Sequence, residues 1–381
     1  MPGQQGIPGQ FLAPRGRDFF AGAARVRRVA LASLCLVAVG GCGGGGALRP
    51  QTQQVRTAGT RSLTQAPAPH PAPRPRPPFA VGLQVVTFVD RSRLIHVPGR
   101  PSQPRALVTL IRYPAQGAAS GVDVSGAAPA RAGAPFPLVV FGHGYEETPG
   151  PYARLLQAWA RSGFVVAAPV FPLENANAPG GPNESDLVNQ PRDVSFVISR
   201  LLALSGARTG FLAGLIDPRQ IAVTGQSDGG ETALAVAYNR YFLDRRVRAA
   251  VILSGATIPG VGGFDFPRPS PPLLATQGTA DTINPPSFTS AFYDIAPPPK
   301  YLLTMFGAPH LGPYTDEQPQ LGIVERVTIA FLEGYLTDVA GARARIATAG
   351  DVPGTSVVAA TVSGKWLKAV RLLEVPGRAA R

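Results

Sequence analysis

A serine between two glycines is the first feature of this 381-residue sequence that could do chemistry. Residues 225–229 read G-Q-S-D-G, which gives Ser227 the spacing G-x-S-x-G. A strand-like run at 221–224 precedes this motif and a helical pattern follows it. That order predicts a sharp strand-to-helix turn that exposes the serine hydroxyl above a sheet. A hydroxyl presented in this way becomes a nucleophile when a neighbouring base activates it.

The base for such a serine would be a histidine, and the chain contains four of them. His70 lies in a proline-rich stretch, His96 in the opening strands, and His143 in a loop before the serine. His310 follows the last parallel strand that the sequence predicts. The chain order serine, acid, histidine is one that catalytic triads use, so we expect His310 to be the base.

A carboxylate between the serine and the histidine would hold the imidazole in one tautomer and stabilise its charged form. Asp281 directly follows a predicted strand at 272–277, in the sequence G-T-A-D. Two other acids are alternatives, because Asp265 lies in a Gly/Pro-rich loop and Asp294 ends a predicted helix. Order and position along the chain favour Asp281.

Attack by a serine on a carbonyl creates an oxyanion, which needs backbone N–H donors. One donor would be the residue after the nucleophile, Asp228. The second would come from residues 141–145, F-G-H-G-Y, where we expect the amide of Tyr145 to donate and its ring to line the acyl pocket. The next two residues, Glu146 and Glu147, are expected to be solvated charges.

The elements around these residues follow an α/β pattern of short apolar strands and helical segments. Two opening strands at 81–88 and 106–113 are expected to be antiparallel. Later runs without alternation, such as 136–141, are typical of parallel strands buried on both faces. Further strands are expected at 164–169, 221–224, 247–253, 272–277 and 301–306, and helices at 152–162, 186–204, 231–242, 287–293 and 321–336. Asp193, near the start of the second helix, is interpreted as structural.

These motifs together resemble the α/β-hydrolase family, in particular the lid-poor branch of cutinase-like polyester hydrolases, platelet-activating-factor acetylhydrolases and dienelactone-hydrolase-like or chlorophyllase-like esterases. The resemblance spans about residues 105–340. It rests on residues 143–145 (H-G-Y), 191–194 (P-R-D-V), 217–221 (D-P-R-Q-I), 225–230 (G-Q-S-D-G-G), 278–281 (G-T-A-D) and 307–310 (G-A-P-H). It implies a single α/β-hydrolase domain, with a mostly parallel central sheet, helices on both faces and no cofactor.

The sequence departs from this family in ways that bear on the substrate. Gln226 precedes the nucleophile where the family commonly has His. The paired C-terminal cysteines of many cutinase-like members are absent, and S-G-A-T-I-P at 254–259 stands where polyester hydrolases tend to carry a Trp. These differences argue against polyester activity.

The N-terminal region resembles a bacterial lipoprotein signal. Basic residues ending at Arg28 precede an eleven-residue apolar run at 29–39, which is too short to span a bilayer. The sequence V-G-G-C then places Cys42 as the lipidated residue of a lipobox. Cys35 would be lost with the signal peptide, so no disulfide is expected. Residues 1–24 fit no signal-peptide pattern, which favours a true start near Val26.

Composition divides the chain into four parts. We expect a signal peptide at 1–41, a lipidated and flexible Pro/Gly-rich tether at 42–79, the hydrolase domain at 80–340 and a C-terminal extension at 341–381. In that extension, 355–362 could add an edge strand or the whole segment could be disordered.

The net charge of +13 is concentrated in the two ends, with +9 in 1–79 and +5 in 340–381, which leaves −1 for the body. This distribution argues against nucleic acid as a partner.

The sequence therefore predicts a serine carboxylic ester hydrolase, anchored to the bacterial cell envelope with its catalytic domain outside the cytoplasmic membrane. A small ester or lipid is the expected substrate and a monomer the expected state. No group of residues has the spacing of a metal site. Two alternatives remain: an acyltransferase on the same fold, and a catalytically silent surface-binding lipoprotein.

Overall fold

A ten-stranded mixed sheet organises the part of the chain that this computed structural model describes, residues 77–258 and 260–362. The strand order is β10-β9-β8-β7-β6-β4-β5-β2-β1-β3, and all described residues belong to one unit. The strands are β1 (Ala80–Ile95), β2 (Gln103–Ala115), β3 (Asp123–Ser125), β4 (Phe136–Gly142), β5 (Val165–Pro169), β6 (Ile216–Gln226), β7 (Val247–Leu253), β8 (Leu273–Gly278), β9 (Lys300–Met305) and β10 (Ser356–Thr361).

The centre of the sheet is parallel from β5 to β9, as the sequence predicts. β4, β5 and β8 are buried at every position, because helices cover the sheet on both sides. The carboxyl ends of β6, β8 and β9 therefore lie at one edge of the sheet, and the loops that follow them carry Ser227, Asp281 and His310.

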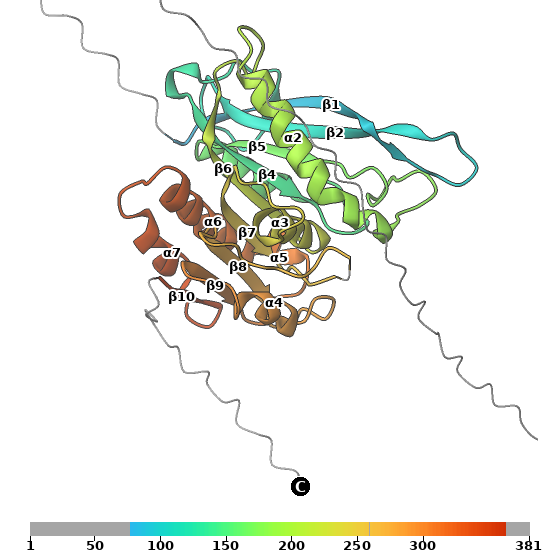
Figure 1. Cartoon of the computed structure of the whole chain (residues 1–381). Helices are drawn as coiled ribbons and strands as arrows, with labels where there is room; N and C mark the ends of the chain where they lie inside the picture. Colours follow the sequence, from blue (N-terminus) through green and yellow to red (C-terminus); the bar gives the residue numbers. More distant parts are fainter. Residues whose placement is uncertain (1–76, 259, 363–381) are drawn as a thin grey trace, which may run out of the picture. The chain divides into compact units, whose positions relative to one another are not determined.

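Two hydrophobic clusters show which helices cover which face. One contains residues of α2, α3 and α4, and the other contains residues of α1, α5, α6 and α7. Figure 1 shows α2 and α3 in front of the strands in this view. The helices are α1 (Ala153–Arg161), α2 (Gln190–Ser205), α3 (Asp228–Tyr238), α4 (Pro286–Tyr293), α5 (Gly312–Thr315), α6 (Gln320–Leu336) and α7 (Ala342–Gly350), with 3-10 turns η1 (Arg131–Gly133) and η2 (Glu184–Asn189).

The opening strands β1 and β2 are antiparallel, as expected, but longer than the sequence predicts. Their outer ends form a hairpin that projects beyond the neighbouring strands (Figure 1). The register shifts between Asp90 and Leu94. Asp90 accepts hydrogen bonds from Ser92 and Arg93 there, so local polar contacts stabilise the irregular segment.

The helix expected at 186–204 is divided in two. Residues 184–189 form η2, and α2 begins at Gln190 with Pro191 in its first turn. Proline has no N–H to donate, so it is favoured at a helix start and does not extend the preceding turn as regular α-helix. β3, α5 and α7 are elements that the sequence analysis did not predict.

The sheet also continues beyond residue 340, where the sequence analysis placed the end of the hydrolase domain. α7 packs against α6, and β10 pairs antiparallel with β9, from Ser356 opposite Met305 to Thr361 opposite Lys300. Residues 341–361 are therefore part of the sheet and its helical layer. Of the two alternatives left open, the edge strand is the one observed.

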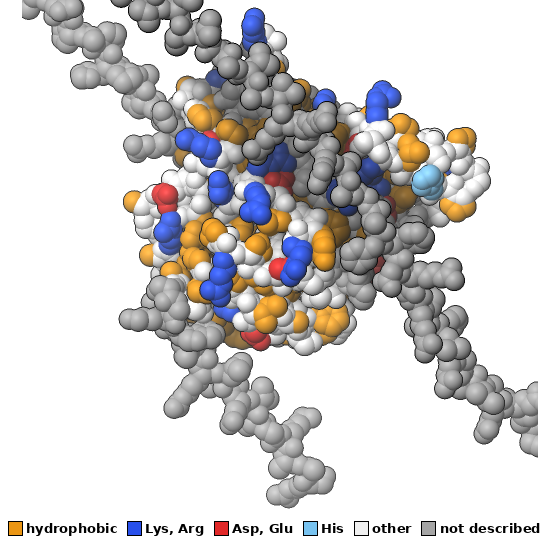
Figure 2. All heavy atoms as spheres, viewed as in Figure 1, with side chains coloured by type: hydrophobic (Ala, Val, Ile, Leu, Met, Phe, Trp, Pro, Cys, Tyr) orange, Lys and Arg blue, Asp and Glu red, His pale blue; other side chains and the backbone are white. Residues whose placement is uncertain are grey.

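Several expectations concern residues outside the described part of the chain. The signal peptide, Cys42, most of the tether at 42–79 and residues 363–381 all lie there. Within the described residues, no helix is both long enough and apolar enough to cross a membrane. On the face in Figure 2, Lys and Arg side chains are interspersed with hydrophobic and uncharged atoms.

Candidate active site

Ser227 lies in a strained turn between β6 and α3. Its φ of 55° and ψ of −121° place it in a backbone region that non-glycine residues rarely adopt. Its amide donates to the carbonyl of Leu253 in β7, and the residue is 7% exposed. The turn thus fixes the serine at the carboxyl edge of the sheet, as the G-x-S-x-G spacing predicts.

Two glycines make this turn sterically possible. A Cβ on Gly225 would lie 2.0 Å from the carbonyl oxygen of Gly229, and a Cβ on Gly229 would lie 2.1 Å from the carbonyl oxygen of Gly142. Both distances are far below van der Waals contact. Glycine is therefore required at these positions because the start of α3 packs directly on β4 and β6.

His310 and Asp281 are brought together by the loops after β9 and β8. Nδ1 of His310 lies 2.8 Å from Oδ2 of Asp281, and the imidazole is 11% exposed. The other carboxylate oxygen accepts hydrogen bonds from the amides of Ile283 and Asn284. Burial opposes ionisation of Asp281, but the hydrogen bonds from His310 and Asn284 outweigh it and lower the pKa of this carboxyl.

The two alternative acids are engaged elsewhere. Asp265 forms an ion pair with Arg240 and accepts its amide N–H at 2.9 Å, and these contacts lower the pKa of Asp265 to about 2. Asp294 is exposed at the end of α4, where its carbonyl accepts a hydrogen bond from Lys300. Among the described residues, Asp281 is the acid in contact with His310.

The oxyanion-loop residues lie beside the serine. A Cβ on Gly144 would be 3.2 Å from Cβ of Ser227, so the following residue, Tyr145, is also close to the turn. Asp228 is the first residue of α3, where the helix leaves backbone N–H groups unpaired. Within the described residues, the amide of Tyr145 donates no backbone hydrogen bond. Both amides are thus available to a ligand.

A buried histidine holds this loop in place. Nδ1 of His143 donates to the carbonyl of Gly144 at 2.8 Å, and Nε2 accepts the amide N–H of Phe171 at 3.0 Å. Burial lowers the pKa of His143 to about 4, so the ring is neutral and can both donate and accept. His143 therefore connects the oxyanion loop to the segment after β5.

That segment brings a second acid to the site. Glu174 is fully buried, and its carboxyl shares a hydrogen bond with the carboxyl of Asp228. No N–H or hydroxyl among the described residues bonds to either Glu174 oxygen. Burial and the neighbouring Asp228 raise the pKa of Glu174 to about 11, so a protonated Glu174 donates to Asp228 at neutral pH.

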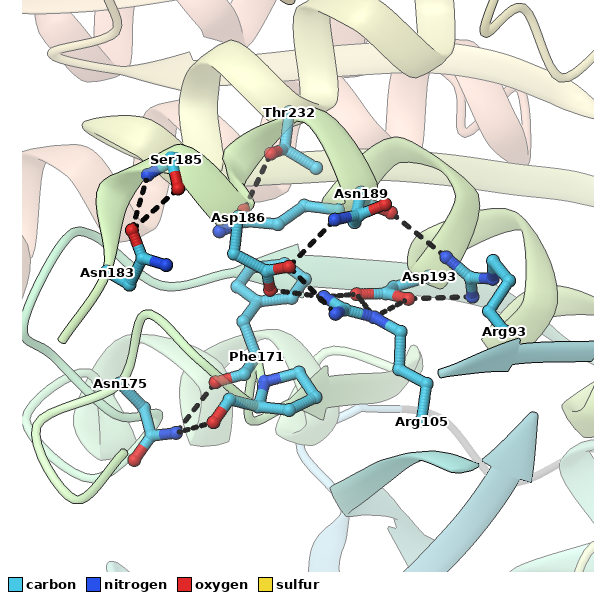
Figure 3. Close-up of polar contacts among 12 residues, drawn as sticks. Arg93, Arg105, Phe171, Asn175, Asn183, Ser185, Asp186, Asn189, Asp193 and Thr232 are labelled. Atoms are coloured by element: carbon cyan, nitrogen blue, oxygen red, sulfur yellow. Dashed lines mark hydrogen bonds and ion pairs between the residues drawn. The ribbon is translucent and has the colours of Figure 1, made fainter. Parts of the chain in front are cut away.

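A buried ion cluster anchors the same segment to the sheet (Figure 3). Arg105, from β2, is 1% exposed and contacts Asp186 of η2 at 2.5 Å and Asp193 of α2 at 2.6 Å. Arg93 pairs with Asp193 at 2.7 Å, and Thr232 of α3 donates to Gln190. Asp193 therefore has a structural role, as expected. It lies in the first turn of α2, and its partners also include two arginines of the opening strands.

Two further residues contact the site in ways that the sequence does not indicate. Asn284 donates to Oγ of Ser227 at 3.5 Å and to the carbonyl of Ser254 at 2.7 Å. Nε2 of Gln226 lies 3.1 Å from Nε2 of His310, and Oε1 of Gln226 accepts a hydrogen bond from Tyr152. Gln226 is noted in the sequence as a departure from the family, but its contact with His310 is not predicted. Asn284 lies three residues after Asp281, so only its closeness in sequence could have indicated it.

Comparison with known protein families bears on the fold and covers only part of the site. The family model described as Chlorophyllase matches residues 116–275, which include Ser227 and end before Asp281 and His310. The described part of the chain has an α/β-hydrolase fold. The matched part is similar to the chlorophyllase family, and the α/β-hydrolase sheet extends beyond it on both sides. A search of curated proteins found no match.

The family match supports a hydrolase and suggests esterase-type chemistry. Ser227, Asp281 and His310, which the sequence places in three separate loops, lie at one edge of the sheet. Within residues 77–258 and 260–362, no group of His, Cys, Asp or Glu side chains has a metal-binding arrangement.

Proposed function

We propose that this α/β-hydrolase is a serine carboxylic ester hydrolase that forms an acyl-enzyme on Ser227. The observation that carries the proposal is the 2.8 Å contact between His310 and Asp281 beside a serine held at positive φ. A carboxylate on Nδ1 keeps the proton on that nitrogen and leaves Nε2 as the base.

In the proposed reaction, Oγ of Ser227 attacks the ester carbonyl while Nε2 of His310 takes its proton. The amides of Tyr145 and Asp228 donate to the oxyanion that forms. When the C–O bond to the alcohol breaks, His310 returns the proton to the leaving oxygen. Water then enters, loses a proton to His310 and hydrolyses the acyl-enzyme, which restores Ser227 and releases the acid.

The proposed location of this reaction is the outer side of the cytoplasmic membrane. The support comes from the sequence, in which Cys42 ends a lipobox and a Pro/Gly-rich stretch leads to the first strand at Ala80. A tether of this composition would leave the catalytic domain free to move near the membrane.

The test is activity on a chain-length series of p-nitrophenyl esters together with labelling by a fluorophosphonate. Ser227→Ala should lower kcat by at least about 10³-fold and abolish labelling, because it removes the nucleophile. The melting temperature should change little. Ser199→Ala, at an exposed position of α2, is the matched control and should behave as wild type. Labelling that persists on another serine of the Ser227→Ala variant would refute the assignment.

A further inference from the structure

Gln226 occupies an unusual position between three parts of the site. It is the last residue of β6, is 1% exposed and directly precedes Ser227. Its side-chain amide contacts the loop that carries His310. A Cβ on Gly144 would lie 2.6 Å from Oε1 of Gln226, so the oxyanion loop packs against the same amide.

The orientation of this amide follows from its partners. One N–H of Gln226 donates to the backbone carbonyl of His310 at 3.2 Å, and a carbonyl can only accept. Oε1 accepts the hydroxyl hydrogen of Tyr152 at 2.8 Å. The NH₂ group therefore faces His310, and its second hydrogen is directed to Nε2 of the imidazole at 3.1 Å.

The tautomer of His310 makes this contact meaningful for catalysis. Because Nδ1 donates to Asp281, Nε2 has a lone pair and accepts from Gln226. In the described part of the chain, Oγ of Ser227 has a hydrogen bond from Asn284 and none to His310. The lone pair that must receive the serine proton is thus occupied by Gln226.

We propose that Gln226 competes with Ser227 for Nε2 of His310, and that exchange of the hydrogen bond at Nε2, from the N–H of Gln226 to the O–H of Ser227, is a step of the reaction. Gln226 donates to Nε2 in the free enzyme, and substrate binding replaces its N–H with the serine O–H. No bond other than these hydrogen bonds changes in this step. The inference rests on the proposed function, because it requires His310 to be the base.

The first test is Gln226→Glu, which keeps the shape of the side chain but replaces the donor with an acceptor. A carboxylate facing Nε2 should draw a proton onto that nitrogen and remove the base. We expect kcat on p-nitrophenyl acetate to fall by about 100-fold or more, with KM within about threefold of wild type, as when an interaction specific to the transition state is lost. Gln116→Glu, the same change at an exposed glutamine, is the control and should retain wild-type kcat.

A second variant separates occupation of Nε2 from general packing. Gln226→Met keeps the length of the side chain and removes the competing donor. Fluorophosphonate labelling of Ser227 should then be as fast as in wild type or several-fold faster, which is the range expected from the loss of one neutral hydrogen bond. Labelling more than about tenfold slower in a variant with wild-type circular dichroism would overturn the proposal.

A measurement on the wild-type enzyme avoids the risk that variants misfold. Crystal structures of the free enzyme and of its fluorophosphonate adduct should show the Nε2 contact with Gln226 in the first and its loss in the second. A contact that persists in the adduct, or wild-type kcat in Gln226→Glu, would refute this inference alone. Activity or labelling that survives Ser227→Ala would instead refute the proposed function.

Discussion

At the scale of single residues, the site is defined by which polar atoms are paired and which are left for a ligand. Asp281 uses one oxygen for His310 and the other for two backbone amides, so its position is fixed independently of the imidazole. The amides of Tyr145 and Asp228 lie beside Ser227 without such partners. A site of this kind is arranged before the substrate arrives.

The role of the acid can be tested by amide substitution. Asp281→Asn should preserve the fold but allow His310 to adopt the other tautomer, which should lower kcat on the order of 10⁴-fold with KM little changed. Asp265→Asn and Asp294→Asn should each remain within about tenfold of wild type, because neither carboxylate contacts His310. Steady-state kinetics on one p-nitrophenyl ester measures all three. A larger loss in Asp265→Asn than in Asp281→Asn would show that the acid is misassigned.

The protonated Glu174 predicts a dependence of stability on pH. Its pKa is raised to about 11 in the folded state, whereas the unfolded carboxyl releases its proton above about pH 4.5. Between these values the folded state binds more protons than the unfolded state, so stability falls as pH rises. Glu174→Gln should remove a slope of up to about 1.4 kcal/mol per pH unit.

Urea unfolding at pH 6 and pH 8 measures this effect. The glutamine variant should gain stability relative to wild type at pH 8, and should gain less at pH 6. Some slope should remain, since burial also raises the pKa of Glu231, to about 9. Glu184→Gln, at an exposed position of η2, is the control. Parallel pH profiles for wild type and Glu174→Gln would contradict the prediction.

At the scale of elements, the segment from Phe171 to Asn189 is held in its middle as well as at its ends. In the middle, the amide of Glu146 donates to the carbonyl of Glu174, and the amide of Ala176 donates to the carbonyl of Glu147. His143 holds its start and the cluster around Arg105 holds η2 and the beginning of α2 (Figure 3). Because Glu174 lies within this segment, the ion cluster at the opening strands helps to place the residue that bonds to Asp228, next to Ser227.

Arg105→Met tests this anchor. It would leave the buried Asp186 without its arginine and Asp193 with Arg93 alone, and breaking a buried ion pair in this way costs about 3–5 kcal/mol. Arg219→Met is the matched control, because Arg219 is 83% exposed and its pair with Asp217 should contribute about 0–1 kcal/mol. Chemical denaturation gives both values. Equal losses in the two variants would show that the cluster is not a stabilising anchor.

At the scale of the whole molecule, the first and last described strands lie toward opposite edges of the sheet. β1 lies next to the edge strand β3, and β10 forms the other edge. β10 protects one side of β9 with backbone hydrogen bonds, and α7 covers it through residues such as Ile346. The segment after residue 340 thus completes the sheet that carries His310 at the end of β9.

The proposed attachment to the membrane predicts a change in location on a single substitution. Cys42→Ser should move the protein from the membrane fraction to the soluble or secreted fraction, because each buried CH₂ of an acyl chain contributes about 0.8 kcal/mol of membrane affinity. Ester hydrolysis by the released protein should be unchanged. Fractionation followed by immunoblotting measures this, and an unaltered membrane fraction would exclude lipidation at Cys42 as the anchor.

The sequence by itself determined the features that depend on neighbouring residues. The glycine pattern around Ser227, the uniform burial of strands such as 136–141 and the order of Ser227, Asp281 and His310 are local signals, and the structure has the corresponding turn, strands and loops. Strain and close backbone approach act within a few residues, so they can be inferred without a fold.

Only the tertiary structure decided the contacts between distant segments. The amide of Gln226 meets His310 across 84 residues, Arg105 meets Asp193 across 88, and Glu174 reaches the carboxyl of Asp228. In each case the packing of strands and loops determines which residue is the partner. The energy of a buried polar group depends on that partner. The residues of the site could be identified from their types and spacing. The protonation of its acids and the hydrogen bonds of its histidine could be determined only from the tertiary structure.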